Sequence, residues 1–264
     1  MDFSKYKAMT FRREGRVLHA TFNRPDSLNA IDRELQYDLD RLFPDVTEDD
    51  ETHVLVITGA GRAFSAGGDV EYMQQAIDNP ESFRRESERG KQRIFAMLDC
   101  PKPIIAKVNG AAAGLGATVA LLCDVVFAAN HAKISDPHVL VGYAAGDGGA
   151  LIWPALIGHA RAKHYLFTGE PVTGEEAARI GLISRALPAG ELDKAVDDYA
   201  QKLANGASKA IQWTKLSANI GLKALAQQAL DASFAYEILS QQTKDHQEAV
   251  NAFRERRAPV FKGE

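Results

Sequence analysis

The sequence predicts an α/β fold with mostly parallel strands and a helical region at its C-terminal end. Up to about residue 150, short runs rich in β-branched and aliphatic residues alternate with helical patterns. This alternation is typical of parallel sheets layered with helices. Beyond that point the strand signals fade and helix-forming sequence dominates. We therefore expect a core over residues 1–204 and a helical region over residues 205–264, with a soft boundary at Asn205-Gly206.

The first half of the chain contains four apolar runs that are typical of strands and two patterns that are typical of helices. The predicted strands are Val17–Phe22, Val54–Thr58, Ile104–Val108 and Val125–Ala128. The first helix has one apolar face, formed by Ile31, Leu35, Leu39 and Leu42. The second begins near Pro80 and ends with the apolar residues Ile94, Phe95 and Leu98. Its charged stretch from Arg84 to Arg93 is interpreted as a solvated helix face.

Helix signals continue through the second half. Thr173 and Glu176 form a capping-box pattern, in which each side chain caps the other's backbone N–H, and Gly181 stands where a helix would end. A further helix is marked by Leu192, Val196, Tyr199 and Leu203. The stretch from Leu222 to about Arg257 is nearly all helix-forming, with His246 and Asn251 as its weak points.

Composition excludes several classes of protein. Hydrophobic residues make up 45% and charged residues 25% of the 264 residues, which argues against a disordered or fibrous chain. The net charge of −4 gives no basic excess for nucleic acid. The longest apolar run, Gly110–Cys123, is shorter than the ~20 residues of a membrane span, so we expect a buried helix there and no membrane association. Cys100 and Cys123 fit neither a disulfide framework nor a zinc site, and a reducing cytoplasm is expected.

The glycines gather in three clusters, and the first follows a predicted strand. The segment Thr58–Asp69 fits neither a dinucleotide fingerprint nor a phosphate-binding P-loop nor a nucleophile elbow. What remains is a glycine-rich turn with bare backbone N–H groups before a predicted helix at 69–77, and such a turn can hold an oxyanion. The alternative is a tight strand-to-helix connection that binds nothing.

The second cluster repeats this arrangement. Asn109–Thr118 follows the strand at 104–108 and leads into a predicted helix at 117–122. Its small residues and helix N-terminus again favour an anion, although close helix packing is an equal alternative. Two such turns could supply the two converging N–H donors that an oxyanion hole needs.

At this point the sequence resembles a known family. The segments Arg62–Asp69, Pro103–Gly110, Gly114-Leu115-Gly116 and Cys123-Asp124 resemble the enoyl-CoA hydratase/isomerase family, also called the crotonase superfamily. Further matches are Asn23-Arg24-Pro25, Asn29-Ala30, Leu166–Gly169 and Phe253–Arg257. The resemblance covers nearly the whole chain in order.

The resemblance implies a spiral of ββα units, the ClpP/crotonase-like fold, followed by a C-terminal α-helical trimerisation region. It implies an acyl-CoA substrate, with CoA arriving as part of the substrate, no tightly bound cofactor, and a homotrimer or dimer of trimers. By motif position, the backbone N–H groups of Gly68 and Leu115 would bind the thioester oxygen. Ala30 and Ala66 stand where relatives contact the CoA adenine, and Asp69 would orient the turn or cap the next helix. A minor possibility is that the basic stretch near residue 90 contacts CoA phosphates.

The chain departs from the family pattern at the two glutamates that hydratases use to add water. Those positions hold Thr118 and His138. Threonine is no general base near neutral pH, so a hydration that uses two carboxylates is in doubt.

The third glycine cluster offers a replacement. His138 is a natural acid or base because its reference pKa of ~6.5 lies near working pH. Asp147 could hold the imidazole in one tautomer and stabilise its charged form. The alternatives are a structural histidine and a turn aspartate. A further variant makes Asp147 itself the base. No metal-ligand spacing appears, so no metal is expected.

The nine-residue spacing from His138 to Asp147 resembles that of 6-oxocamphor hydrolase, a family member that cleaves a carbon–carbon bond by a retro-Claisen reaction. That relative also uses a glutamate in its C-terminal helices, for which Glu237 is the candidate here. The chain nevertheless keeps the Phe64–Asp69 turn of CoA-using relatives, which that hydrolase lacks. Hydratase/isomerase chemistry, retro-Claisen hydrolysis of a β-diketone or β-keto-acyl-CoA, and a non-catalytic or RNA-binding homologue therefore remain as hypotheses.

Overall fold

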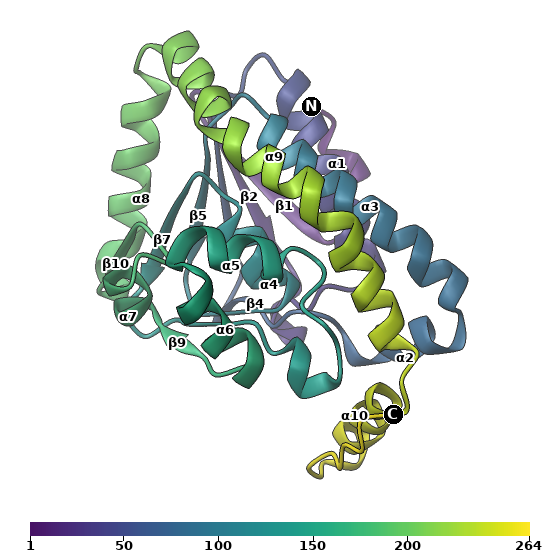
Figure 1. Cartoon of the computed structure of the whole chain (residues 1–264). Coiled ribbons are helices and arrows are strands. Elements are labelled where there is room, and N and C mark those ends of the chain that lie inside the picture. The colour runs from purple at the N-terminus through teal and green to yellow at the C-terminus, as the bar shows by residue number, and fades with distance from the viewer.

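A computed structural model describes residues 1–264, and its backbone forms two sheets surrounded by helices (Figure 1). The larger sheet has six strands in the order β1-β2-β3-β5-β7-β10, and the smaller has four in the order β4-β6-β8-β9. The strands of the larger sheet are β1 (Met9–Glu14), β2 (Val17–Phe22), β3 (Val54–Gly59), β5 (Ile104–Val108), β7 (Val125–Ala129) and β10 (Arg185–Leu187). Those of the smaller are β4 (Ala63–Ser65), β6 (Ala111–Ala113), β8 (Lys133–Ser135) and β9 (Val172–Thr173).

Parallel pairing dominates, as the sequence predicts. β1 and β2 form an antiparallel pair, and the five strands from β2 to β10 in the larger sheet are parallel. In the smaller sheet β4, β6 and β8 are parallel, and β9 is antiparallel to β8. The four predicted strands are confirmed as β2, β3, β5 and β7. The smaller sheet was not predicted, because strands of two or three residues are too short to show a period.

The helices before residue 130 begin and end near the predicted positions. They are α1 (Arg33–Glu48), α2 (Val70–Asp78), α3 (Pro80–Asp99) and α4 (Leu115–Leu121). The side chain of Asp32 caps α1 by accepting from Leu35 N–H, and a side-chain acceptor at this position satisfies an otherwise unpaired helix N–H. The predicted face of α1 is buried, but Ile31 lies before the helix, in an isolated bridge to Gly68.

The second half consists mainly of helices, together with the short 3₁₀ helix η3 (His138–Val141) that precedes them. They are α5 (Gly149–Ile157), α6 (His159–Thr168), α7 (Gly174–Arg179), α8 (Ala189–Ala204), α9 (Ser208–Gln241) and α10 (Lys244–Glu255). Thr173 caps α7 as predicted, by accepting from Glu176 N–H. The reciprocal half of the capping box is absent, because the Glu176 carboxylate pairs with Arg179 instead. The expected weak points lie inside α10, and the break comes earlier, at Gln242 and Thr243.

The core lies on both faces of the larger sheet. α8 packs against β2, β3, β5 and β7, while α4 and the smaller sheet cover the other side near β5. α3 lies between α1 and α9, and Figure 1 shows α9 crossing diagonally over this layer before α10 turns away. No helix combines the length and the apolar character that crossing a membrane would require.

Candidate active site

The first two glycine clusters lie side by side because the strands that lead into them are paired. β4 and β6 are parallel, with Ala63 opposite Ala111, so both strands end at the same edge of the sheet. Gly67 and Gly114 follow these strand ends with φ angles of 87° and 50°. Residues other than glycine rarely adopt such positive φ angles. A Cβ atom on Gly67 would stand only 2.8 Å from the Ala113 carbonyl oxygen. Glycine therefore permits the two turns to touch.

Each turn leaves one backbone N–H without an acceptor in the protein. Leu115 is the first residue of α4, so its N–H has no partner within the helix. In the bridge to Ile31, the neighbours of Gly68 supply the contacts: Ile31 N–H donates to Gly67 O, and Asp69 N–H donates to Ile31 O. The Gly68 N–H itself stays free. Gly68 and Leu115 both line one cavity, so the structure brings the two predicted oxyanion donors to a common space.

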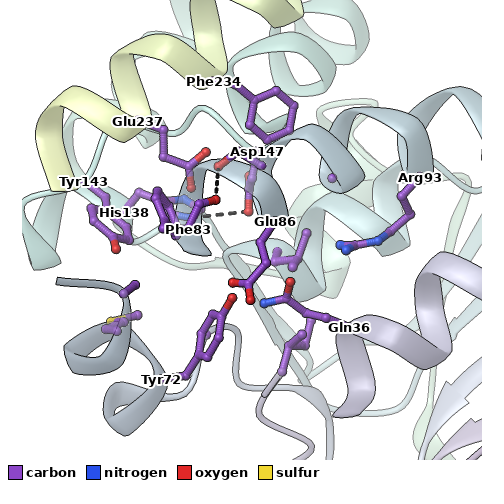
Figure 2. A pocket seen from close by; sticks show the side chains of 17 residues that line it. Gln36, Tyr72, Phe83, Glu86, Arg93, His138, Tyr143, Asp147, Phe234 and Glu237 are labelled. Atoms are coloured by element: carbon purple, nitrogen blue, oxygen red, sulfur yellow. Dashed lines mark hydrogen bonds and ion pairs between the residues drawn. The ribbon is translucent and has the colours of Figure 1, made fainter. Parts of the chain in front are cut away.

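His138 lies in the same cavity, between two carboxylates (Figure 2). Its Nδ1 is 2.5 Å from Asp136 Oδ1, and its Nε2 is 3.4 Å from Asp147 Oδ2. Asp147 contacts the imidazole, so its role in holding the ring stays a prediction, and Asp136 adds a second carboxylate that the sequence did not predict. The closer contact is that of Asp136 with Nδ1. Asp147 contacts the other ring nitrogen, Nε2, and the same Asp147 carboxylate also contacts Thr118 of α4.

Thr118 and His138, the two residues that depart from the family pattern, both contact the side chain of Asp147. Thr118 Oγ1 donates to Asp147 Oδ1 at 3.2 Å, and His138 contacts Oδ2 of the same carboxylate. The loop reaches α4 because Gly148 has a φ of 120° and a Cβ there would stand 2.7 Å from Thr118 Cγ2. Thr118 and His138 thus both contact one carboxylate, that of Asp147.

These charges set the protonation of the pair. Burial opposes the charged imidazole, but the carboxylates of Asp136 and Asp147 raise the pKa of His138 well above its usual value. Burial alone would raise the pKa of Asp147, yet the imidazolium and the Thr118 hydroxyl lower it. At neutral pH the resting site therefore contains an imidazolium next to a carboxylate.

Glu237 adds a further carboxyl group to this end of the cavity. It projects from α9, is buried, and has no partner for Oε2. Burial and the nearby charge of Asp147 raise the pKa of Glu237 well above its usual value. A Cβ on Gly146 would stand 2.5 Å from Glu237 Cβ, so glycine lets the loop that carries Asp147 approach α9. Figure 2 shows the Glu237 carboxyl directed toward Asp147.

The residues predicted to contact CoA lie outside this cavity. Ala66 is exposed and its N–H donates to Leu28 O, which holds its turn next to the buried Ala30. Asp69 caps α2 by accepting from Tyr72 N–H at 3.0 Å, so the capping alternative is confirmed.

Two features escaped the sequence analysis. The first is the contact of Asp136 with His138, for which the only signal in the sequence is that the two residues are two positions apart. The second is the charged stretch of α3, which is not wholly solvated: Arg93 is buried and Glu86 lines the cavity. Asp136, His138 and Asp147 also each offer a metal-ligand atom within 4.8 Å of one another, but the ion pairs among them already account for this closeness.

Comparison with known proteins agrees with this architecture. Residues 12–264 match the family model described as enoyl-CoA hydratase/isomerase. The chain belongs to the enoyl-CoA hydratase/isomerase family. It is similar to (E)-benzylidenesuccinyl-CoA hydratase of Thauera aromatica, with 34% identity over 97% of this chain and 99% of that protein. It is also similar to crotonyl-CoA hydratase of Syntrophomonas wolfei subsp. wolfei, with 31% identity over 97% of this chain and 98% of that protein.

Solved structures of the enoyl-CoA hydratase/isomerase family confirm the predicted fold class. An enoyl-CoA hydratase/isomerase from Mycobacterium paratuberculosis superposes with a TM-score of 0.87 at 35% identity, over 92% of this chain and 97% of that one. An enoyl-CoA hydratase from Mycobacterium avium subsp. paratuberculosis K-10 gives a TM-score of 0.88 at 28% identity, over 97% and 99% of the two chains.

Proposed function

We propose that this enzyme binds an acyl-CoA thioester with its carbonyl oxygen at the N–H groups of Gly68 and Leu115. The observation that carries the proposal is their position: two unpartnered backbone donors share one cavity with the His138–Asp147 pair. Donors fixed in place before the reaction stabilise an enolate oxygen without reorganising. The names of the relatives, which specify CoA thioester substrates, support this choice.

The protonation of the pair supports hydratase/isomerase chemistry with one acid and one base. The Asp147 carboxylate takes a proton from water as the water oxygen bonds to the β-carbon. The electron pair of the double bond moves toward the thioester oxygen, where the two N–H groups hold the charge. The His138 imidazolium then donates a proton to the α-carbon. Asp136 holds Nδ1 and keeps Nε2 directed at the reacting groups. The pair thereby replaces the two glutamates of the hydratases.

The buried carboxyl of Glu237, whose Oε2 has no partner and whose pKa is raised by burial and by Asp147, favours a second candidate, retro-Claisen hydrolysis of a β-diketone or β-keto-acyl-CoA. Here water adds to the keto carbon while Asp147 accepts its proton. The bond between that carbon and the α-carbon breaks, the electron pair becomes the enolate, and a proton from an acid completes the second product. Glu237 is a third titratable group, beside His138 and Asp147, and the hydration scheme does not use it. In the retro-Claisen reaction Glu237 could supply the proton to the enolate.

The remaining features are proposed from the family resemblance. We propose that Ala30 and Ala66 contact the CoA adenine, that CoA arrives only as part of the substrate, and that the enzyme works in the cytoplasm. The two free, buried cysteines agree with a reducing compartment. Residues 205–264 would form the trimerisation region, which is supported by large apolar side chains exposed on α9 and α10, among them Trp213, Ile220, Leu239 and Phe253.

Mass spectrometry of the products separates the two reactions. The enzyme is incubated with a series of enoyl-CoA esters and with linear and cyclic β-keto-acyl-CoA esters. Hydration adds water across the double bond, whereas hydrolysis opens a ring or splits a chain with the gain of one water. We expect hydration, with His138→Gln inactive. If His138→Gln retained full activity, the proposed acid would be wrong, and tight RNA binding without any acyl-CoA turnover would overturn the enzyme assignment.

A further inference from the structure

The cavity has a second polar region, separate from His138 and Asp147. Figure 2 shows the side chains of Gln36, Tyr72 and Glu86 gathered away from the acid–base pair. They come from α1, α2 and α3, which form a wall that the acid–base chemistry does not use. Apolar groups line much of the rest of the cavity, namely Ile31, Met73, Ala76, Phe83 and Phe234.

Tyr72 is the group that points to a ligand. Its hydroxyl oxygen is buried and has no hydrogen-bond partner. A buried hydroxyl without a partner has lost its hydration and gained no hydrogen bond in return, which is unfavourable until a ligand supplies one. Glu86 stands beside it with a side chain only 11% exposed, and its contacts are long: 3.4 Å to Arg33 and 3.4 Å to Ser82. Burial raises the pKa of Glu86. Both groups have hydrogen-bonding capacity left for a molecule in the cavity.

The charges in this region balance. Arg93 is 4% exposed, and its guanidinium contacts Asp40 Oδ1 through Nε at 2.7 Å and a terminal nitrogen at 2.6 Å. Glu86 has Arg33 as its counter-ion. Arg33 and Arg93 are thus each matched by a carboxylate. A third cation, the exposed Arg89, lies over the Tyr37 ring and does not line the cavity. A carboxylate placed here would face Glu86 without a free cation, which is unfavourable in a largely buried site.

We propose that this region, formed by Gln36, Tyr72 and Glu86, binds a neutral oxygen function on the acyl chain, a hydroxyl or a carbonyl, beyond the reacting carbons. The inference rests on the proposed binding of acyl-CoA in this cavity. A hydroxyl accepts from Tyr72 and donates to Glu86, and a carbonyl accepts from Tyr72 and from the Gln36 amide. The apolar lining of the cavity takes the methylene chain. The substrate class is therefore an oxygenated acyl-CoA rather than a plain alkyl one.

Binding of saturated acyl-CoA esters tests the proposal without turnover. Isothermal titration calorimetry compares chains of equal length that end in a methyl group, a hydroxyl, a ketone or a carboxylate. We expect the hydroxyl- or keto-terminated ester to bind most tightly. Tyr72→Phe removes only the unpartnered oxygen, so the protein should fold as before. It should weaken binding of the oxygenated ester about fivefold, the effect of one net hydrogen bond, and leave the methyl-terminated ester unchanged.

Tyr37→Phe provides the matched control, because Tyr37 is next to Gln36 in sequence, is 43% exposed and does not line the cavity. The proposal is overturned if the methyl-terminated ester binds as tightly as the oxygenated ones. It is also overturned if the carboxylate-terminated ester binds best, or if Tyr72→Phe affects all esters alike. Failure of every ester to bind would instead overturn the proposed function, so the two failures are distinguishable.

Discussion

At the scale of single residues, His138 is unusual because each of its ring nitrogens faces a carboxylate. One carboxylate would be enough to fix a tautomer. Two of them keep the ring charged, so the resting site holds a proton that it can donate. This arrangement supports the proposed roles, an acid for His138 and a base for Asp147, whereas an isolated histidine near neutral pH could take either role.

The charge on His138 predicts how stability depends on pH. A histidine whose pKa is raised by folding stabilises the protein fully below its unfolded pKa of about 6.5, and this contribution is lost as pH rises through the folded pKa. The difference in free energy of unfolding between wild type and His138→Gln should therefore shrink above about pH 6.5. Urea unfolding measured at a series of pH values checks this. An NMR titration of the His138 ring with a midpoint at or below the ordinary value would contradict it.

Asp147 predicts a kinetic effect that separates charge from shape. Asp147→Asn keeps the size of the side chain but removes the base, and kcat should fall by about 10²–10⁴-fold, the usual contribution of a general base. Asp198→Asn is the control, since Asp198 forms only an exposed pair with Lys194. Steady-state kinetics on the best substrate, with thermal melting to confirm folding, make the comparison. Equal activity of Asp147→Asn and wild type would exclude Asp147 as the base.

The sequence predicts some of these residues and not others for a physical reason. His138 and Asp147 can be found because one replaces a residue of a known pattern and the other lies among glycines. Asp136 has only its position two residues before His138 as a signal, and Glu86 has none, because an aspartate before a proline and a glutamate in a charged helix are common on surfaces. Only the three-dimensional packing shows that their side chains are buried and turned inward.

At the scale of elements, the glycine turns couple the sheet to the acid–base pair. Gly114 has a φ of 50°, and a Cβ there would stand 3.5 Å from His138 Cε1. Gly114 thus precedes α4 and also packs against the His138 ring. The length of a strand affects whether the sequence predicts it. Four of the five strands with five or six residues are found, β1 being the exception, whereas β4 and β6, which set the positions of both donors, have three residues each and are missed.

Gly114→Ala should therefore affect stability and activity together. Forcing a side chain into this backbone region costs about 1–3 kcal/mol, and the added methyl group presses on His138. We expect a lower melting temperature and a lower kcat than for wild type. Gly190→Ala is the matched control, because no atom lies within 4 Å of its Cβ position. The interpretation of the turn is wrong if both variants melt and react alike.

At the scale of the whole molecule, α9 joins two features. One side of the helix places Phe234 and Glu237 in the cavity, while Trp213, Ile220 and Leu239 are exposed along it. A division between residues 1–204 and 205–264 therefore places an acidic group of the site in the second part. Large exposed apolar groups along one helix favour association with another copy of the chain.

The proposed trimerisation predicts a change of mass on a charge substitution. Wild type should have the mass of three or six chains in light scattering coupled to size-exclusion chromatography. Ile220→Glu combined with Leu239→Glu places charges among the exposed apolar groups and should shift the mass toward one chain. Lys194→Glu combined with Lys202→Glu on α8 is the control and should leave the assembly unchanged. A monomeric wild type would refute this proposal.

The pairing of β4 with β6 has a consequence for how this family diversifies. The thioester oxygen would be held by backbone groups whose positions depend on strand register, and a side-chain substitution hardly alters them. Proton transfer depends instead on a few side chains from α4, the loop after η3 and α9. Substitutions of these side chains therefore leave the backbone donors in place, except where a side chain packs against a turn, as His138 does against Gly114. The same pair of backbone donors could therefore work with different acids and bases introduced by point mutation. New reactions on the same thioester intermediate would then need no new fold.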